Sequence, residues 1–289
     1  MFVNAFLNGE YLKSEEAGVS IDDRGFLFGD GVYEVMRFYN SVLFKPAEHL
    51  ARLKNSLDGI ELAAPYPLEQ IEEIASNLVQ KSGIKEGVLY MQITRGSAPR
   101  THAFPASSHP TVMMKVSEVH TETLRESRRG VKVVTFPDKR WDYCHIKSLN
   151  LLANVMANEY AQKQGAHEAV FLHPIGVTEC SSSNVFIVKE GKIITAPEGE
   201  RILPGITRKL VIQLAREAEI SVEFRFPQNQ ELFNADEVFI TNTVDEVTPV
   251  VSVDGKAISD GSVGPVTRKL QTMFQELVST TSEGRSKTP

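Results

Sequence analysis

Several features that mark special classes of protein are scarce in this chain of 289 residues. It has only two cysteines, Cys144 and Cys180, whose spacing matches no metal site, so we expect free thiols in a reducing cytoplasm and no bound metal. Its uninterrupted apolar runs are a few residues long, which argues against a membrane span. Acidic residues outnumber basic ones, 37 to 31, which argues against nucleic acid or an anionic membrane as a partner.

A basic segment is also missing from the start of the chain, where Met1–Phe6 is expected to form a first strand and not a signal peptide. The remaining composition, 42% hydrophobic and 24% charged, is ordinary for a soluble globular protein. A chain of 289 residues is long enough for two compact domains, each with its own core.

The strongest candidate for a domain boundary is the polar, charged segment 121–129, which we predict to be an interdomain linker. A solvated helical turn there is equally compatible with a boundary. This predicts a small N-terminal domain over 1–120, a C-terminal domain over 130–280 and a flexible tail over 281–289. Strands and helices alternate in both domains, so the predicted class is α+β, with a cleft between the domains as the place for a site.

Periodicity predicts the main elements. Residues 32–39 alternate as a strand, and a helix beginning at Pro46 repeats Leu50, Leu53 and Leu57 on one face. A second helix over 67–81 ends just before Gly83. We further predict strands over 88–94, 111–119 and 131–136 and near residues 169, 185, 193, 222, 238 and 250, and helices over 150–163, 206–219 and 263–277.

Two positions together suggest chemistry with a carbonyl cofactor. Lys147 is predicted to follow a strand and precede an apolar helix, where its amine would reach a cleft and could form a Schiff base. Glu179 precedes three serines and an apolar strand, where a buried carboxylate could hold a pyridine nitrogen protonated. A lysine and an acid in these roles describe a pyridoxal 5'-phosphate (PLP) site. Taken singly, each has an ordinary reading, as a solvent-exposed lysine and a turn glutamate.

A phosphate cradle is predicted where the loop Leu203–Gly205 opens the amphipathic helix that begins at Ile206. Backbone N–H groups at a helix N-terminus bind anions, with help from a hydroxyl such as that of Thr207. Thr243 could supply a second hydroxyl and Arg52 a positive charge. The alternative for this loop is a simple helix start.

The motifs in combination resemble fold-type IV PLP enzymes, the class IV aminotransferases. The matching segments run in the expected order over most of the chain: Asp23–Phe26, Phe28–Glu34, Thr94–Gly96, Ile146–Asn150, Thr178–Glu179 with Ser181–Phe186, and Gly205–Arg208. The resemblance implies a small N-terminal α/β domain and a larger, β-barrel-like C-terminal domain with helices. It also implies that Lys147 holds PLP and moves the proton and that Glu179 binds the ring nitrogen. The implied phosphate ligands are Arg52, Ile206, Thr207 and Thr243.

Within that family, Arg100-Thr101-His102 resembles the Arg-x-His loop of D-amino acid (D-alanine) aminotransferases. The segment Tyr33–Val35 agrees with this. The resemblance implies that Tyr33, Arg100 and His102 bind the substrate carboxylate beside Val35, with the loop reaching in from the second subunit of a homodimer. It implies ping-pong transamination of D-alanine or D-glutamate with pyruvate or 2-oxoglutarate.

Arg37 leaves the choice of substrate open. It lies on the same strand face as Tyr33 and Val35, and branched-chain aminotransferases carry an arginine at the matching place. Arg37 could therefore bind a carboxylate and widen or invert the substrate preference; the alternative is an arginine in solvent or in a salt bridge. Two other activities of the same fold thus compete: branched-chain L-amino acid transamination and elimination by a 4-amino-4-deoxychorismate lyase.

Overall fold

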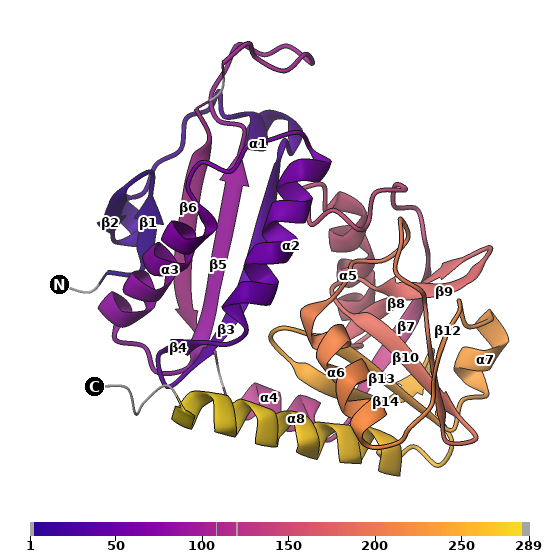
Figure 1. Ribbon diagram of the computed structural model, residues 1–289. Helices are drawn as coiled ribbons and strands as arrows, with labels where there is room; N and C mark the ends of the chain where they lie inside the picture. Colours follow the sequence, from indigo (N-terminus) through magenta and orange to yellow (C-terminus); the bar gives the residue numbers. More distant parts are fainter. Residues whose placement is uncertain (1–2, 108, 120, 285–289) are drawn as a thin grey trace. The chain divides into compact units, whose positions relative to one another are not determined.

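The computed structural model describes residues 3–107, 109–119 and 121–284 of the chain (Figure 1). These residues divide into two compact units. Unit 1 comprises residues 3–119, 146–150 and 280–284, and unit 2 comprises 121–145 and 151–279, within the described ranges. The short segment Ile146–Asn150, which contains Lys147, therefore belongs to unit 1 although both of its flanking segments belong to unit 2.

Unit 1 is built on a six-stranded antiparallel sheet in the order β2-β1-β6-β5-β3-β4. Its strands are β1 (Ala5–Leu7), β2 (Glu10–Leu12), β3 (Gly31–Tyr39), β4 (Val42–Leu43), β5 (Gly87–Thr94) and β6 (Thr111–Glu118). Its helices are the 3-10 turn η1 (Ser14–Glu16), α1 (Arg24–Phe28), α2 (Pro46–Gly59) and α3 (Leu68–Ser82).

Helices α2 and α3 form where their sequence patterns predict them. Pro46 occupies the first turn of α2, where its missing N–H costs no hydrogen bond. Leu53 and Leu57 of α2 are at most 1% exposed, a burial that stabilises the fold by about 1.5–3 kcal/mol per side chain. Gly83 ends α3 in the left-handed conformation, with φ of +68°, that glycine adopts without strain.

Strand β3 places its side chains alternately on two faces of the sheet, as its sequence predicts. Val32, Met36 and Phe38 are buried in the hydrophobic core that also contains the α2 and α3 leucines. Tyr33 and Val35 lie on the opposite face and are half-buried. One face of β3 therefore stabilises the unit, and the other carries the predicted substrate residues.

Unit 2 is built on a nine-stranded mixed sheet in the order β12-β11-β10-β13-β14-β7-β8-β9, with β15 paired to β14. Its strands are β7 (Val131–Pro137), β8 (Glu168–His173), β9 (Gly176–Cys180), β10 (Asn184–Lys189), β11 (Lys192–Thr195), β12 (Val222–Phe224), β13 (Glu237–Asn242), β14 (Glu246–Val253) and β15 (Lys256–Ala257). Its helices are α4 (Thr121–Ser127), α5 (Leu152–Lys163), α6 (Ile206–Glu217), α7 (Asn229–Phe233) and most of α8 (Pro265–Gly284), whose residues 280–284 belong to unit 1. Strands β7 and β8 are parallel and are connected through α5.

The two units and their sheets confirm the predicted α+β class with two domains. Several short elements were not predicted, among them α1, α7 and strand β9. Residues 121–127 of the predicted linker form helix α4, with Leu124 buried. In the predicted tail, α8 continues to Gly284, and residues 285–289 lie outside the described part of the chain.

No helix among the described residues has the length and apolar character needed to cross a membrane.

Candidate active site

The predicted site residues fall in both units. Unit 1 contains Lys147, Tyr33, Val35, Arg37, Arg52, Arg100 and His102, and unit 2 contains Glu179, Ile206, Thr207 and Thr243.

The backbone around Lys147 is fixed against the start of β3. The carbonyl of Lys147 accepts a hydrogen bond from the N–H of Tyr33 (3.0 Å), and the N–H of Leu149 donates to the carbonyl of Gly31 (3.1 Å). The N–H of Lys147 donates to the hydroxyl of Ser56 on α2 (3.1 Å). Lys147 thus lies in an irregular segment between β7 and α5, as predicted in outline, and this segment is held on unit 1 by hydrogen bonds on both sides.

The amine of Lys147 lies over an aromatic pair. Its Nζ atom is 4.1 Å from the centroid of the Tyr33 ring, within the range of a cation–π contact. Tyr33 stacks on Tyr90 of β5, with ring centroids 5.7 Å apart. Burial raises the pKa of Tyr90 to about 12, so its phenol stays neutral and donates to Oε1 of Gln92 (2.8 Å). The side chain of Lys147 therefore rests on one ring of a stacked aromatic pair.

Arg37 is the most unusual residue on this face of β3. Its side chain is 2% exposed, and its Nε and Nη1 atoms have no hydrogen-bond partner among the described residues. Its guanidinium lies over the ring of Tyr39, 4.7 Å from the centroid. Neither the solvent position nor the salt bridge considered from sequence is observed within the described chain. Buried donors without partners are costly, so Arg37 is suited to receiving an anion.

Arg52 is held by a carboxylate in the core of unit 1. Its Nε and Nη2 atoms donate to Glu34 of β3 (2.7 and 2.8 Å), and Nδ1 of His49 lies 2.9 Å from the same carboxylate. Burial alone would raise the pKa of Glu34, but Arg52 and His49 lower it far below its usual range. Burial lowers the pKa of His49. An ionised Glu34 thus fixes the direction of the predicted phosphate ligand Arg52, a role that the sequence pattern did not reveal.

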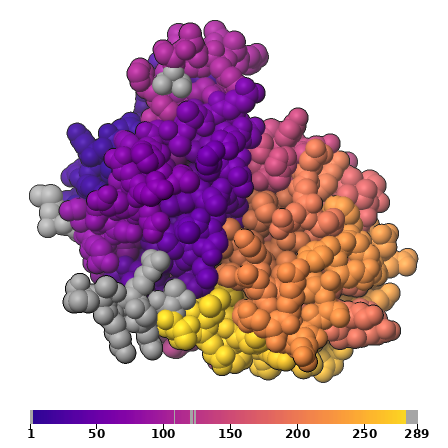
Figure 2. Space-filling model, in the orientation of Figure 1, coloured from indigo at the N-terminus to yellow at the C-terminus, as the bar shows by residue number. Residues whose placement is uncertain are grey.

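Arg100 and His102 are exposed on the loop between β5 and β6, which projects beyond the sheet of unit 1 (Figures 1 and 2). Arg24 anchors this loop, because its Nη1 donates to the carbonyl of Thr101 (2.7 Å). Arg100 lies 5.2 Å from the centroid of the Phe28 ring, and His102 packs edge-on against the same ring. Within the described chain, no hydrogen bond or ring contact joins Arg100 or His102 to Lys147.

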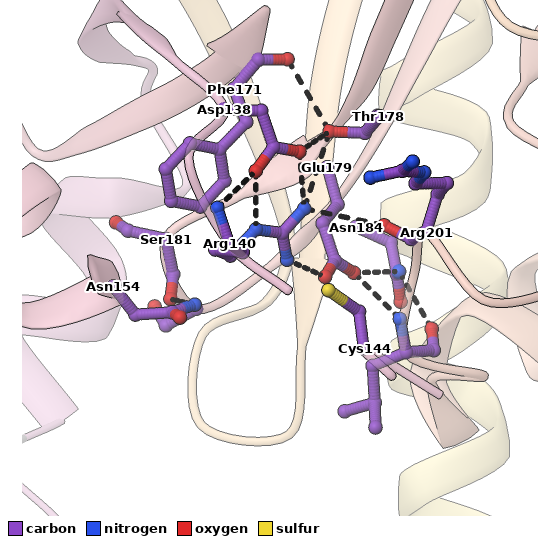
Figure 3. A network of polar contacts seen from close by, with 12 residues as sticks. Asp138, Arg140, Cys144, Asn154, Phe171, Thr178, Glu179, Ser181, Asn184 and Arg201 are labelled. Atoms are coloured by element: carbon purple, nitrogen blue, oxygen red, sulfur yellow. Dashed lines mark hydrogen bonds and ion pairs between the residues drawn. The ribbon is translucent and has the colours of Figure 1, made fainter. Parts of the chain in front are cut away.

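Glu179 lies on β9 and is only 5% exposed, at the centre of a hydrogen-bonded network (Figure 3). Its Oε1 atom accepts a close hydrogen bond from Nη1 of Arg140. Its Oε2 atom accepts from Nδ2 of Asn184 (3.1 Å) and from the N–H of Leu203 (2.9 Å). Burial raises the pKa of Glu179 to about 7, although Arg140 and these hydrogen bonds favour the ionised form.

Arg140 was not predicted as a site residue. It follows β7 in the sequence Asp138-Lys139-Arg140, and its Nε and Nη2 atoms donate to the carboxylate of Asp138 (3.0 and 2.8 Å). A charged pair two residues apart directly after a strand is the one signal that the sequence offers. The sequence does not show that Glu179 contacts Arg140, because this contact depends on how β7, β8 and β9 pair.

The three serines after Glu179 form a tight turn around another buried carboxylate. Glu168 of β8 accepts hydrogen bonds from the hydroxyls of Ser181, Ser182 and Ser183 and from the N–H of Ser182. Burial raises the pKa of Glu168, and the serine donors oppose that change. The serines therefore serve to hold the turn that follows β9.

The predicted phosphate site lies at a helix N-terminus that no side chain caps. Gly205 is the N-cap of the 12-residue helix α6, no side chain caps it, and its first turn carries no acidic residue. The N–H groups of Ile206 and Thr207 belong to this first turn, where a helix leaves its donors without intrahelical partners. The hydroxyl of Thr207 donates to the carbonyl of Asn242 (3.0 Å), which ties α6 to the turn that contains Thr243.

These residues fit the phosphate and ring of PLP. An uncapped helix N-terminus is a natural anion site. On the neighbouring strand β13, the buried hydroxyl of Thr241 has no partner within the described chain. Glu179 retains one unused acceptor position on Oε1, since a carboxylate has about four lone-pair sites.

Comparison with known proteins assigns the family. The model of the family "Amino-transferase class IV" matches residues 31–253. The D-alanine aminotransferase of Staphylococcus haemolyticus is 42% identical over 277 residues, which cover 96% of this chain and 98% of that protein. The D-alanine aminotransferase of Bacillus licheniformis is 42% identical over 276 residues, covering 96% and 97%.

Solved structures of similar fold support the same family. A T.th. branched-chain amino acid aminotransferase with pyridoxamine 5'-phosphate superimposes with a TM-score of 0.89 at 28% identity, covering 98% of this chain and 97% of that one. A Legionella pneumophila structure assigned as a 4-amino-4-deoxychorismate lyase gives a TM-score of 0.82 at 25% identity, covering 90% and 95%. The chain belongs to the class IV aminotransferase family and is an aminotransferase of fold type IV.

Proposed function

We propose that this protein transaminates D-amino acids, with D-alanine or D-glutamate as donor and pyruvate or 2-oxoglutarate as acceptor, in a ping-pong reaction with PLP in the cytoplasm. The observation that carries the proposal is the 42% identity, over nearly the full length, to D-alanine aminotransferases, in a chain whose candidate lysine is fixed on unit 1. When bound, PLP supplies an aldehyde that takes up the amino group and a ring that withdraws electrons.

Lys147 is the catalytic residue in this proposal. Its amine binds the cofactor, and it later removes the proton from the α-carbon of the substrate and delivers a proton back. The hydrogen bonds to Tyr33 and Ser56 hold its peptide, and the aromatic surface of Tyr33 limits the arc through which the amine can swing. These contacts would keep the amine, and the proton that it moves, on the side of β3 that carries Tyr33.

The other residues would hold the cofactor. Glu179 would accept the ring N–H on its unused Oε1 position and keep the ring nitrogen charged. The N–H groups of Ile206 and Thr207, with the hydroxyl of Thr243, would bind the phosphate, and Arg52 would add positive charge from α2. Glu34 fixes the direction of that guanidinium.

The substrate would be oriented by its carboxylate. With the α-proton facing Lys147, a carboxylate held by Tyr33, Arg100 and His102 leaves one side free for the substituent. That arrangement accepts one enantiomer and rejects the other, and moving the trap would invert the preference. Val35 would then border the space for the substrate's side chain.

We also propose a homodimer in which the loop of one subunit completes the site of the other. The exposure of Arg100 and His102 on a projecting loop supports this. The surface of α5 supports self-association too: its alanines Ala157 and Ala161 face the sheet and are buried. Its larger apolar side chains point away: Leu152, Val155, Met156 and Tyr160 are 73%, 58%, 59% and 42% exposed. Their spacing of three, four and eight residues places them on one stripe, a patch typical of an interface.

The test follows the cofactor's absorbance in a single half-reaction. PLP-loaded protein is mixed with D-alanine, D-glutamate or L-leucine, and conversion of the aldehyde cofactor to its amine form is recorded. The proposal expects conversion with the D-amino acids. Conversion with L-leucine alone would assign the branched-chain activity of the structural relatives. Release of pyruvate from an aminodeoxychorismate-like compound without any acceptor would assign the lyase activity.

A further inference from the structure

We propose that Arg140, clamped by Asp138, is the positioning residue that orients Glu179 and supplies the positive charge that keeps it ionised toward the cofactor's ring nitrogen. This inference rests on the proposed function, because it assigns a role around the PLP ring. It adds two residues, Asp138 and Arg140, to the proposed site.

Each nitrogen of the Arg140 guanidinium has a hydrogen-bond partner, and its plane packs on an aromatic ring. Its Nε and Nη2 form a bidentate pair with Asp138, and its Nη1 binds Glu179. Nη2 also lies 3.2 Å from the carbonyl oxygen of Arg201, and the plane covers the ring of Phe171 at 4.3 Å. The side chain is 5% exposed, so this is a desolvated and geometrically specific ion pair, unlike an exposed one.

The network leaves one acceptor position on the carboxylate of Glu179 for a further hydrogen-bond donor. Oε2 is filled by Asn184 and by the N–H of Leu203, and Oε1 is engaged once, by Arg140 (Figure 3). The remaining lone pair on Oε1 lies beside the Arg140 contact. A shift of Arg140 would therefore change both the orientation of the carboxylate and the acceptor it presents.

The charges of the network do not balance without a cofactor. Two carboxylates, Asp138 and Glu179, share one guanidinium, so the ionised cluster has one negative charge in excess. Burial opposes the ionisation of Asp138, but Arg140 lowers its pKa below the usual value; the pKa of Glu179 is raised to about 7. A protonated ring nitrogen next to Glu179 would supply the missing positive charge.

The other ionisable groups around Glu179 cannot take over the role of Arg140. Burial raises the pKa of the Cys144 thiol to about 11, so it stays neutral. Arg201 pairs with Asp142 (2.6 Å). Arg208 pairs with Glu198 (2.9 Å).

The roles of Arg140 and Asp138 can be separated because they act on Glu179 with opposite sign. Arg140 lowers its pKa through attraction, and Asp138 raises it through repulsion. Arg140→Met should therefore raise the pKa of Glu179 and Asp138→Asn should lower it, each by about 1–3 units. If Arg140 and Asp138 had a purely structural role, both substitutions would shift the pKa of Glu179 in the same direction, because both would loosen the same Asp138–Arg140 ion pair.

The experiment titrates Glu179 in the cofactor-free protein by NMR of ¹³C-labelled glutamate carboxyls, with Glu179→Gln to assign the signal. A parallel measurement follows the ¹⁵N shift of ¹⁵N-labelled PLP in the loaded protein at neutral pH. Arg140→Met should move the ring nitrogen toward its neutral form, and Arg140→Lys should restore part of the charge. Arg225→Gln, which removes an arginine that pairs with Glu231 outside this network, is the matched control.

The proposal would be supported if the pKa of Glu179 rises in Arg140→Met, falls in Asp138→Asn and is unchanged in the Arg225→Gln control. Shifts in the same direction, or an unchanged titration in folded variants, would overturn it. If Arg140→Met does not fold, Arg140→Lys and Asp138→Asn carry the same test, with a smaller rise and a fall expected. A wild-type protein that binds no PLP would overturn the proposed function and the cofactor part of this inference, whereas the titration of Glu179 in cofactor-free protein tests the effect of Arg140 and Asp138 on the carboxylate by itself.

Discussion

Gly205 packs directly against the side chain of Asn184. A Cβ atom at position 205 would overlap Oδ1 of Asn184, whose Nδ2 donates both to Glu179 and to the carbonyl of Leu203 (3.1 and 2.9 Å). One asparagine therefore joins the start of α6, where a phosphate would bind, to the acid that would hold the ring nitrogen. In the proposed site, the spacing between the phosphate-binding helix end and Glu179 would therefore depend on a contact that only glycine permits.

We expect Gly205→Ala to displace Asn184 and so weaken the binding of PLP. The overlap should also lower the free energy of unfolding by about 1–3 kcal/mol, the usual cost of forcing a group into a packed site. Fluorescence titration with PLP and denaturant unfolding measure the two effects. Gly18→Ala is the control, because nothing lies within 4 Å of a Cβ at that position. An unchanged PLP affinity in Gly205→Ala would separate Asn184 from the cofactor site.

Replacing Lys147 by alanine should abolish transamination. General acid–base catalysis alone accounts for about 10²–10⁴-fold in rate, and the covalent attachment of the cofactor would be lost as well. Borohydride reduction of PLP-loaded wild-type protein should tag the peptide that contains Lys147, as detected by mass spectrometry. The neighbouring Lys139 provides the control, and Lys139→Ala should keep both the tag and the activity. A tag on any other lysine would move the site.

The sequence predicted the elements whose pattern is local. The alternation along β3 and the leucine spacing of α2 each fix one buried face without reference to distant residues, and both predictions are confirmed. The cap that starts α1 was overlooked, although Asp23 accepts from the N–H of Gly25 (2.8 Å). Such a five-residue helix has too few turns to show a period.

Contacts between distant segments were beyond prediction. Arg140 and Glu179 are 39 residues apart and meet only because β7, β8 and β9 pair side by side. Helix α5 was predicted from its apolar residues, but its sequence did not reveal that the alanines face the sheet and the larger side chains face away. Both features depend on strand register and on packing, which a single sequence does not encode locally.

Stability should depend on pH through Glu179. Its pKa in the folded protein, raised by burial from 4.5 to about 7, means that its contribution to stability is complete below pH 4.5 and is lost as the pH rises through 7. Relative to Glu179→Gln, the cofactor-free wild type should therefore lose about 3 kcal/mol of unfolding free energy between about pH 4.5 and 8. Urea unfolding across this range tests it. Glu217→Gln, at an exposed position of α6, should show no such difference.

Arg37 should contribute to the binding of substrates that carry a second carboxylate. Its buried donors without partners are costly in the free protein, so Arg37→Met should raise the free energy of unfolding by about 1 kcal/mol. The same variant should raise the KM for D-glutamate more than the KM for D-alanine, because only the former could offer a second anion. Arg216→Met, at an exposed position, should change neither. A destabilised Arg37→Met with an unchanged ratio of KM values would make Arg37 a structural residue.

The apolar stripe on α5 predicts that self-association depends on it. Met156→Lys places a charge in the middle of four exposed apolar side chains and should shift the protein from dimer to monomer, as measured by sedimentation velocity. Asn158→Lys adds the same charge at an exposed position outside the stripe and should leave the mass unchanged. If the loop of Arg100 serves the partner's site, the monomeric variant should also lose activity while it keeps its secondary structure. A dimeric and fully active Met156→Lys would place the interface elsewhere on the chain.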